Sequence, residues 1–175
     1  PVEYLRKDGQ PIKAWIVNSW HTPWTVLPRL QHAKLAGVDV ITIQAGHGWL
    51  LHQFLSPRTN TRKDQYGGTL RNRCRFPLEV LARVREIVGD DTLIQLSVSA
   101  VEHIKGGDTL ANTIEFVQMA RPYVDLVHVT ASVNIDSRAS TIIHSTRITY
   151  LLIAHYAAAI KEKTDLPVAA VGGIV

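Results

Sequence analysis

The stretch from Ile43 to Phe76 reads IQAGHGWLLHQFLSPRTNTRKDQYGGTLRNRCRF, and it indicates both the fold and the site of this chain. It begins as the end of a β-branched run that is typical of a buried strand, and no further helical pattern starts before Phe76. Connections this long without secondary structure of their own are uncommon in compact domains and are usually functional. Gln44, His47 and Trp49 leave the strand first, so the stretch predicts a site at a strand end.

Outside this stretch, short apolar runs alternate with longer amphipathic segments. The apolar runs predict buried strands at 38–43, 92–98, 125–130 and 166–171. The amphipathic segments predict helices at 25–36, 76–88, 108–120 and 149–161, the third with Asp108 or Thr109 as its N-cap. Residues 1–24 carry neither pattern, and we expect them to form an irregular lead-in segment.

The lengths of the connections indicate the fold class. Long segments follow the predicted strands, at 44–75, 99–108 and 131–148, whereas the turns from helix to strand are short. This asymmetry favours an α/β fold of parallel strands alternating with helices, a TIM (β/α)8 barrel whose active site lies in the loops after the strands. A doubly wound open sheet is the alternative. Four strands do not close a barrel, so we expect residues 1–175 to form a single partial (β/α) barrel domain.

Composition and charge exclude several classes of protein. The hydrophobic fraction is 46% and the charged fraction 19%, as in globular domains, and no apolar run reaches the length of a membrane span. The net charge is +4, and between Arg58 and Arg75 Asp64 is the only acid among several basic residues. A basic cluster of this kind fits an anionic cofactor, a nucleic acid or a solvated loop. No nucleic-acid-binding motif accompanies it, so we expect neither a nucleic-acid nor a membrane partner.

Cysteine and histidine usage narrows the chemistry further. Cys74 is the single cysteine, which rules out an internal disulfide, fits a reducing compartment and predicts a cytoplasmic protein. Its neighbours Arg73 and Arg75 could activate the thiol, but a packing role is favoured. The eight histidines show no metal-ligand spacing, so we predict no metal site.

The opening stretch resembles the signature of the Old Yellow Enzyme family. The segment HGWLLHQFLSP at 47–57 is followed by Asn60, Arg62, Asp64, Tyr66-Gly67-Gly68 and by NRCRF at 72–76. Members of this family are FMN-dependent NAD(P)H:flavin oxidoreductases, including enoate and dienoyl reductases. The resemblance implies a partial chain that supplies the fourth to seventh strands of the barrel. Arg62, Asp64, Tyr66 and Arg73 are then expected to form a charge-assisted network that fixes the long loop.

The resemblance assigns roles to individual residues near the strand ends. Gln44 and His47 stand where the family has a His and a His or Asn that donate hydrogen bonds to a substrate carbonyl. Trp49 stands where reductases of the family usually have a proton-donating Tyr, and an indole N–H is no useful acid at neutral pH. These three residues are the catalytic candidates.

The cofactor-binding candidates lie on later strands. Gln95 takes the place of an Arg that faces the flavin pyrimidine edge in the family, so less electrostatic stabilisation of reduced FMN is expected. Gly172 and Gly173 resemble the loop that binds the FMN phosphate with backbone N–H groups.

Two functional hypotheses from different classes follow. The first is an FMN-dependent oxidoreductase that passes hydride from NADH or NADPH to an activated alkene or similar small-molecule acceptor. The second is a catalytically inactive barrel fragment that self-associates as a homo-oligomer or depends on the missing barrel segments, because an open sheet edge invites pairing with another chain. An anion- or nucleic-acid-binding module built on the Arg58–Arg75 cluster is a weaker third.

Overall fold

The sheet consists of parallel strands that pair in the order in which they occur in the sequence. The computed structural model describes residues 13–17, 23–133 and 151–171. The sheet order is β1-β2-β3-β4-β5, and the strands are β1 (Ala14–Val17), β2 (Val40–Ala45), β3 (Leu93–Ser99), β4 (Leu126–Thr130) and β5 (Val168–Ala170). A doubly wound sheet reverses its strand order at a switch point, and this sheet does not. The sequential order is that of a barrel wall.

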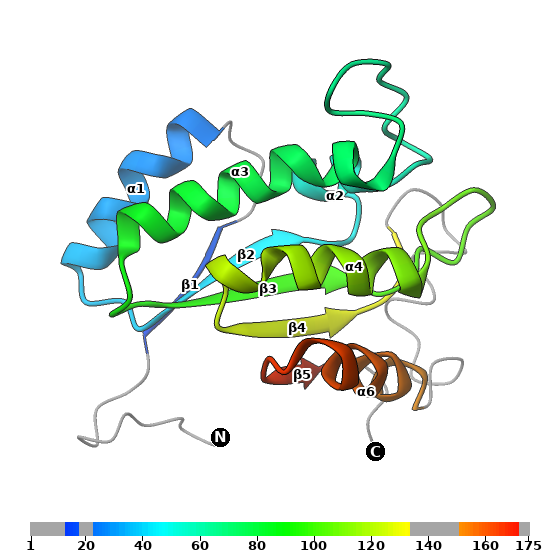
Figure 1. The fold of residues 1–175 in the computed structure, drawn as a ribbon. Coiled ribbons are helices and arrows are strands. Elements are labelled where there is room, and N and C mark those ends of the chain that lie inside the picture. The colour runs from blue at the N-terminus through cyan, green and yellow to red at the C-terminus, as the bar shows by residue number, and fades with distance from the viewer. Residues whose placement is uncertain (1–12, 18–22, 134–150, 172–175) are drawn as a thin grey trace.

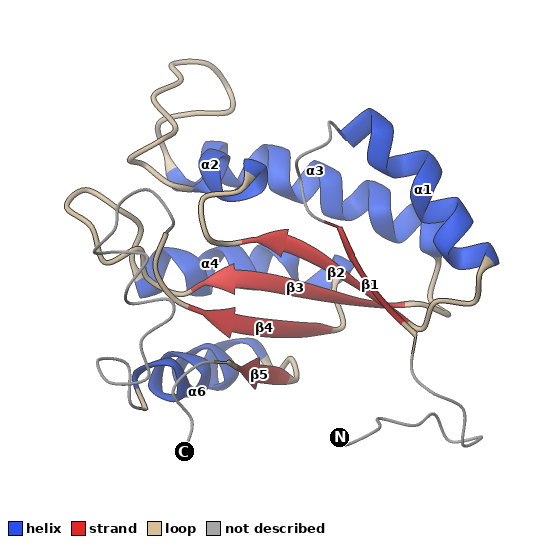
Figure 2. Cartoon of the chain, turned by 180° about the vertical axis from the view of Figure 1, so that it is seen from behind, coloured by secondary structure: helices blue, strands red, loops and turns tan. Residues whose placement is uncertain are grey.

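The helices all cover one face of the sheet. Figure 1 shows them in front of the strands, and Figure 2 shows the opposite face of the sheet without any helix. They are α1 (Pro23–Leu35), α2 (Leu50–Leu55), α3 (Leu70–Val88), α4 (Leu110–Ala120), the 3-10 turn η1 (Arg121–Tyr123) and α6 (Leu152–Thr164). This single layer is the outer ring of part of a TIM barrel. None of these helices is long and apolar enough to cross a membrane.

Strand alternation separates an apolar face from a polar one. Along β3, Ile94, Leu96 and Val98 are buried on the helix side, where Leu81, Val84 and Phe116 pack in the same core. Successive side chains of a strand point to opposite faces, so the residues between them face the uncovered side. On β2 to β4 that side carries Val40, Leu93 and Leu126 at the strand starts, followed by the polar residues Thr42, Gln44, Gln95, Ser97, Ser99, His128 and Thr130.

The structure corrects the predicted secondary structure in residues 1–24 and within the stretch 43–76. Strand β1 lies inside residues 1–24, which were expected to be irregular. Helix α2 and the first turns of α3 lie inside the segment predicted to be one long loop. Helix α3 begins at Leu70, before the predicted start at residue 76, and runs through Pro77 because Cys74, Pro77, Leu81 and Val84 form one buried stripe. The loop that remains covers residues 56–69.

Side chains that bond to main-chain groups hold this shorter loop. The amide of Asn60 donates to the carbonyls of Phe54 (2.6 Å) and Tyr66 (2.7 Å). Buried Arg73 donates to the carbonyls of Leu55 (2.6 Å) and Gly68 (2.8 Å). The predicted network exists only in part: Asp64 pairs with Arg62 and accepts from the Tyr66 amide (3.0 Å). Arg73 does not join them, because it bonds to the main chain and lies 3.8 Å from Asp108.

Gly67 and Gly68 close the loop for different reasons, so alanine substitutions at the two positions should have different effects on stability. A Cβ at Gly67 would lie 2.1 Å from the carbonyl oxygen of Arg62, whereas a Cβ at Gly68 (φ +79°) meets no atom within 4 Å. We expect G67A to lower the free energy of unfolding by about 3 kcal/mol and G68A by about 1 kcal/mol. Urea unfolding followed by circular dichroism measures both, and equal losses would contradict the close packing of Gly67.

Candidate functional site

The candidate site begins in a tight turn directly after β2. The amide of Trp49 donates to the carbonyl of Gly46 over 3.2 Å, and the two central residues, His47 (φ 58°) and Gly48 (φ 84°), both have positive φ. This is the pattern of a type I′ turn. Glycine adopts it freely, but a histidine there is strained and persists only when its surroundings fix the backbone.

Four hydrogen bonds fix this turn from outside and from helix α2. The His47 amide donates to Ser99 Oγ on β3 (2.9 Å), and the Gly48 amide donates to Nδ1 of His52 (2.7 Å). The side chain of Gln53 donates to the Gly48 carbonyl (2.8 Å), and the Gln53 amide donates to the carbonyl of Trp49 (2.8 Å). The short helix therefore holds the turn that precedes it.

The turn brings Gln44 and His47 together. Nε2 of the Gln44 amide lies 3.2 Å from Nδ1 of His47. An amide nitrogen only donates, so Nδ1 accepts and the proton of the neutral His47 ring is on Nε2. Oε1 of Gln44 is buried, and no donor among the described residues reaches it. The pair thus places one ring N–H and one carbonyl oxygen at the strand end, and both Nε2 of His47 and Oε1 of Gln44 are buried there.

Trp49 follows the pair as the N-cap residue of α2, and its side chain makes no cap hydrogen bond. It is half-buried at the same strand end. The structure therefore places His47 and Trp49 in the turn and Gln44 near the end of the strand that leads into it.

Gln95 lies deeper on the same face of the sheet. It is opposite Thr42 in the β2–β3 register, while Gln44 is opposite Ser97. Its amide Nε2 donates to Thr42 Oγ1 over 3.1 Å, which uses one of its two hydrogens. Strands β2, β3 and β4 carry no Asp, Glu, Lys or Arg, so the face beside Gln95 has hydroxyl, amide and imidazole groups but no fixed cation.

Sequence reasoning missed a second polar pair on this face. Ser97 Oγ lies 3.1 Å from Nδ1 of His128 on β4, and burial lowers the pKa of His128. The sequence LIQLSVS at 93–99 alternates polar and apolar residues, which is the signal of a half-buried strand. We predicted that strand as nearly all apolar, and the alternation would have placed Gln95, Ser97 and Ser99 on one face.

A buried carboxylate under the turn was also missed. Glu102 has no exposed surface, and its Oε2 accepts from the Asp108 amide (2.7 Å) and from Ser56 Oγ (3.0 Å). Nε2 of His52 lies 3.3 Å from Glu102 Oε1, a close contact that is not well aligned as a hydrogen bond. Burial raises the pKa of Glu102 and lowers the pKa of His52 to about 4, with His47 as a lesser cause for His52. No spacing motif links His52 and Glu102, so the sequence offered no signal for this pair.

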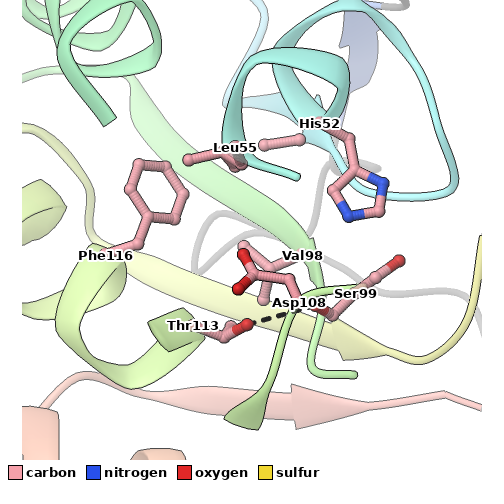
Figure 3. A pocket seen from close by; sticks show the side chains of 8 residues that line it. His52, Leu55, Val98, Ser99, Asp108, Thr113 and Phe116 are labelled. Atoms are coloured by element: carbon pink, nitrogen blue, oxygen red, sulfur yellow. Dashed lines mark hydrogen bonds between the residues drawn. The ribbon is translucent and has the colours of Figure 1, made fainter. Parts of the chain in front are cut away.

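The small cavity beside His52 is not a ligand site. Figure 3 shows it between α2, α4 and the end of β3, with His52, Asp108 and Thr113 as polar walls and Leu55 and Phe116 as apolar ones. Its volume of about 10 Å³ is close to the smallest that holds one water. Any larger ligand must bind elsewhere, and Gln44 and Gln95 lie on the uncovered face of the sheet.

The remaining predictions concern two glycines, the cysteine and metal binding. Gly172 and Gly173 lie outside the described residues. Cys74 is fully buried, and burial raises the pKa of its thiol to about 12 despite Arg73 beside it, which confirms packing over reactivity. Within the described ranges, no group of three or more His, Cys, Asp or Glu side chains could hold a metal ion.

A family profile and individual relatives of this chain point to the same family. The profile of the NADH:flavin oxidoreductase / NADH oxidase family matches residues 30–175. A NADH oxidase of Thermoanaerobacter brockii is 38% identical over 143 residues, which cover 81% of this chain and 22% of that protein. A NADPH dehydrogenase of Bacillus subtilis is 35% identical over 144 residues, which cover 81% of this chain and 40% of that protein. The chain thus spans less than half the length of these relatives.

Solved structures agree on the fold. A 2-naphthoyl-CoA reductase complex superposes with a TM-score of 0.75 at 28% identity, over 83% of this chain and 22% of that chain. An Old Yellow Enzyme homologue from Zymomonas mobilis superposes with a TM-score of 0.64 at 21% identity, over 87% of this chain and 42% of that chain. The second likeness is one of fold alone, and it supports the assignment of the sheet to part of a TIM barrel.

Buried His52 predicts a loss of stability in acid. Its pKa of about 4 lies below its ordinary 6.5, so between these values the unfolded chain binds more protons than the folded one. The free energy of unfolding should therefore fall as the pH drops from 6.5 to 4, by up to about 3 kcal/mol.

Urea unfolding across this pH range measures the effect, and H52N should remove this part of the slope. Glu102 and Asp108, whose pKa values burial raises, act in the opposite direction and remain in the variant as an internal control. An unchanged slope in H52N would contradict the assignment to His52.

Proposed function

We propose, because this chain belongs to the NADH:flavin oxidoreductase / NADH oxidase family (the Old Yellow Enzyme family), that it binds an activated alkene or a similar acceptor for reduction by NADH or NADPH through FMN. The observation that carries the proposal is the pair of Gln44 and His47, whose Nε2 and Nδ1 atoms lie 3.2 Å apart at the C-terminal end of β2. FMN, which family membership implies, supplies hydride transfer when bound. Active sites of TIM barrels lie at this end of the strands.

The pair is suited to bind an electron-poor carbonyl. With Nδ1 of His47 accepting from Gln44, the Nε2–H of His47 is the ring donor. Hydrogen bonds to a carbonyl oxygen stabilise the negative charge that develops there when hydride adds to the conjugated carbon. Gln44 orients His47 but carries no charge. The stabilisation of the developing negative charge therefore depends more on His47 here than it would in a site with two imidazoles.

The face around Gln95 fits a flavin ring edge. The flavin pyrimidine edge alternates donors and acceptors, and an amide with one remaining N–H, beside hydroxyl groups, matches that alternation. We assign Gln95 to this edge and Gly172 with Gly173 to the phosphate. Because strands β2 to β4 supply no cation, we expect weak stabilisation of the anionic reduced cofactor.

Trp49 serves as a wall over the site, and not as an acid. Its indole N–H does not ionise at neutral pH, so the proton that completes alkene reduction must come from water or from another group. In this assignment Gln44 and His47 bind the acceptor, and Trp49 does not deliver the proton.

A second candidate function rests on the open sheet. In the described part of the chain β1 and β5 each pair with one neighbour, and Leu93 is 46% exposed on the uncovered face. Such edges favour association with another chain, so a structural role as a self-associating or partner-dependent module is the alternative. Sedimentation of the purified chain distinguishes the two, because a monodisperse monomer that binds FMN argues against the alternative.

Binding of FMN is the direct test of the cofactor assignment. Titration of the chain with FMN, followed by flavin fluorescence and absorption, should give saturable binding. We expect Q95A to weaken the affinity about tenfold, through loss of its hydrogen bonds. The matched control is Q118A, because Gln118 is an exposed amide on α4. A chain that leaves the spectrum of FMN unchanged would remove the basis of this assignment.

Reduction of a cyclic enone by NADPH tests the role of His47. We expect H47A to lower kcat/KM about a hundredfold, as loss of one donor to a developing oxyanion does. H47N should retain part of the activity, because Asn donates and tolerates positive φ. The control is H32A, since His32 is exposed on α1. Equal rates for H47A and the unchanged chain would rule out this role.

A further inference from the structure

The backbone of the acceptor-binding turn is strained at His47, and its stability must come from outside the turn. His47 has a left-handed backbone (φ 58°) that side-chain-bearing residues rarely adopt. Two side chains fix it by accepting hydrogen bonds from main-chain amides. Ser99 accepts from the His47 amide, and His52 accepts from the Gly48 amide. The bond at His52 is the shorter, at 2.7 Å.

That bond determines the tautomer of His52. The Gly48 amide can only donate, so Nδ1 of His52 must carry a lone pair, and the proton of the neutral ring must be on Nε2. Nε2 faces Oε1 of Glu102 at 3.3 Å. Had the proton been on Nδ1, two hydrogens would point at each other at the Gly48 amide.

Glu102 lies on the Nε2 side of the ring and favours a proton there by its charge, without an aligned hydrogen bond. Its Oε2 is already used by Ser56 and the Asp108 amide, and among the described residues Oε1 has His52 as its close polar neighbour. A carboxylate accepts and does not donate, so it favours the ring with hydrogen on the near nitrogen. Glu102 comes from the loop after β3, and therefore a second strand end controls the turn after β2.

An ordinary buried histidine would bond within its own helix or to core groups nearby. His52 instead bonds to the residue next to His47, across the N-terminus of α2. We propose that His52 is a positioning residue: held as the Nε2–H tautomer by Glu102, it keeps Gly48 and thereby His47 in the geometry that meets the acceptor. The positioning effect is a property of the fold, and its consequence for turnover rests on the proposed function.

Two substitutions at position 52 separate its two contacts. Asn places an acceptor near the position of Nδ1 and loses the reach to Glu102, whereas Gln reaches toward Glu102 and loses the acceptor for Gly48. We expect the Gly48 amide to exchange its hydrogen about tenfold faster in H52Q than in H52N, through loss of one hydrogen bond. With FMN and a cyclic enone, H52Q should raise KM more than H52N does while FMN affinity stays equal.

A measurement on the unsubstituted chain tests the mechanism without any cofactor. Nitrogen-15 NMR of the imidazole ring distinguishes the Nδ1–H and Nε2–H tautomers, and we expect Nε2–H for His52. An Nδ1–H ring, or equal Gly48 exchange in H52Q and H52N, would overturn the proposal. If FMN binding and turnover are absent but both NMR results hold, the proposed function fails and the positioning of the turn stands. If a variant does not fold, the tautomer of His52 measured in the unsubstituted chain still tests the proposal.

Discussion

Parallel pairing in sequence order is the constraint from which the other features of this chain follow. Each strand must return to the opposite end of the sheet before the next can pair, and here every return passes over the same face. One face is therefore covered by helices and holds the apolar core, while the other is free to carry polar side chains. The same constraint gathers the loops that follow the strands at one edge, which is why Gln44 and His47 lie near the loop that contains Glu102.

Burial of polar groups then connects those loops. Glu102 is fully buried, and a buried carboxylate is costly unless donors surround it. Its donors come from Ser56 in the loop after β2 and from the Asp108 amide in its own loop, with His52 of α2 beside them. Arg73 adds main-chain contacts to Leu55 and Gly68. The loops are thus joined by polar contacts to one another, and the shape of the site depends on them.

The sequence predicted what depends on local pattern. Apolar runs marked four of the strands, and the predicted helices at 25–36 and 76–88 end within one residue of α1 and α3. Helix α2 was missed because it has six residues and follows an unusual turn, so no stripe of helical period could form. The start of α3 was missed because residues 70–75, LRNRCR, are mostly polar, and the burial of Arg73 and Cys74 depends on tertiary contacts.

The site divided in the same way. Gln44, His47 and Trp49 were identified from their resemblance to a family signature, and they lie at the end of β2 and in the turn that follows it. His52 and Glu102 were not, because their contact joins residues fifty positions apart and no periodicity records it. Pairings of that range become predictable only once the order of the strands is known.

The bond from the His47 amide to Ser99 spans 52 positions, and this has a consequence for how the chain folds. A turn that is local in sequence depends here on partners that arrive only when β3 has paired with β2. Contacts between distant residues form late and slowly, because the chain between them must first be ordered. In a newly made chain, β2 and β3 should therefore pair before the turn at His47 takes its final geometry. A correctly formed turn would then show that β2 and β3 have paired.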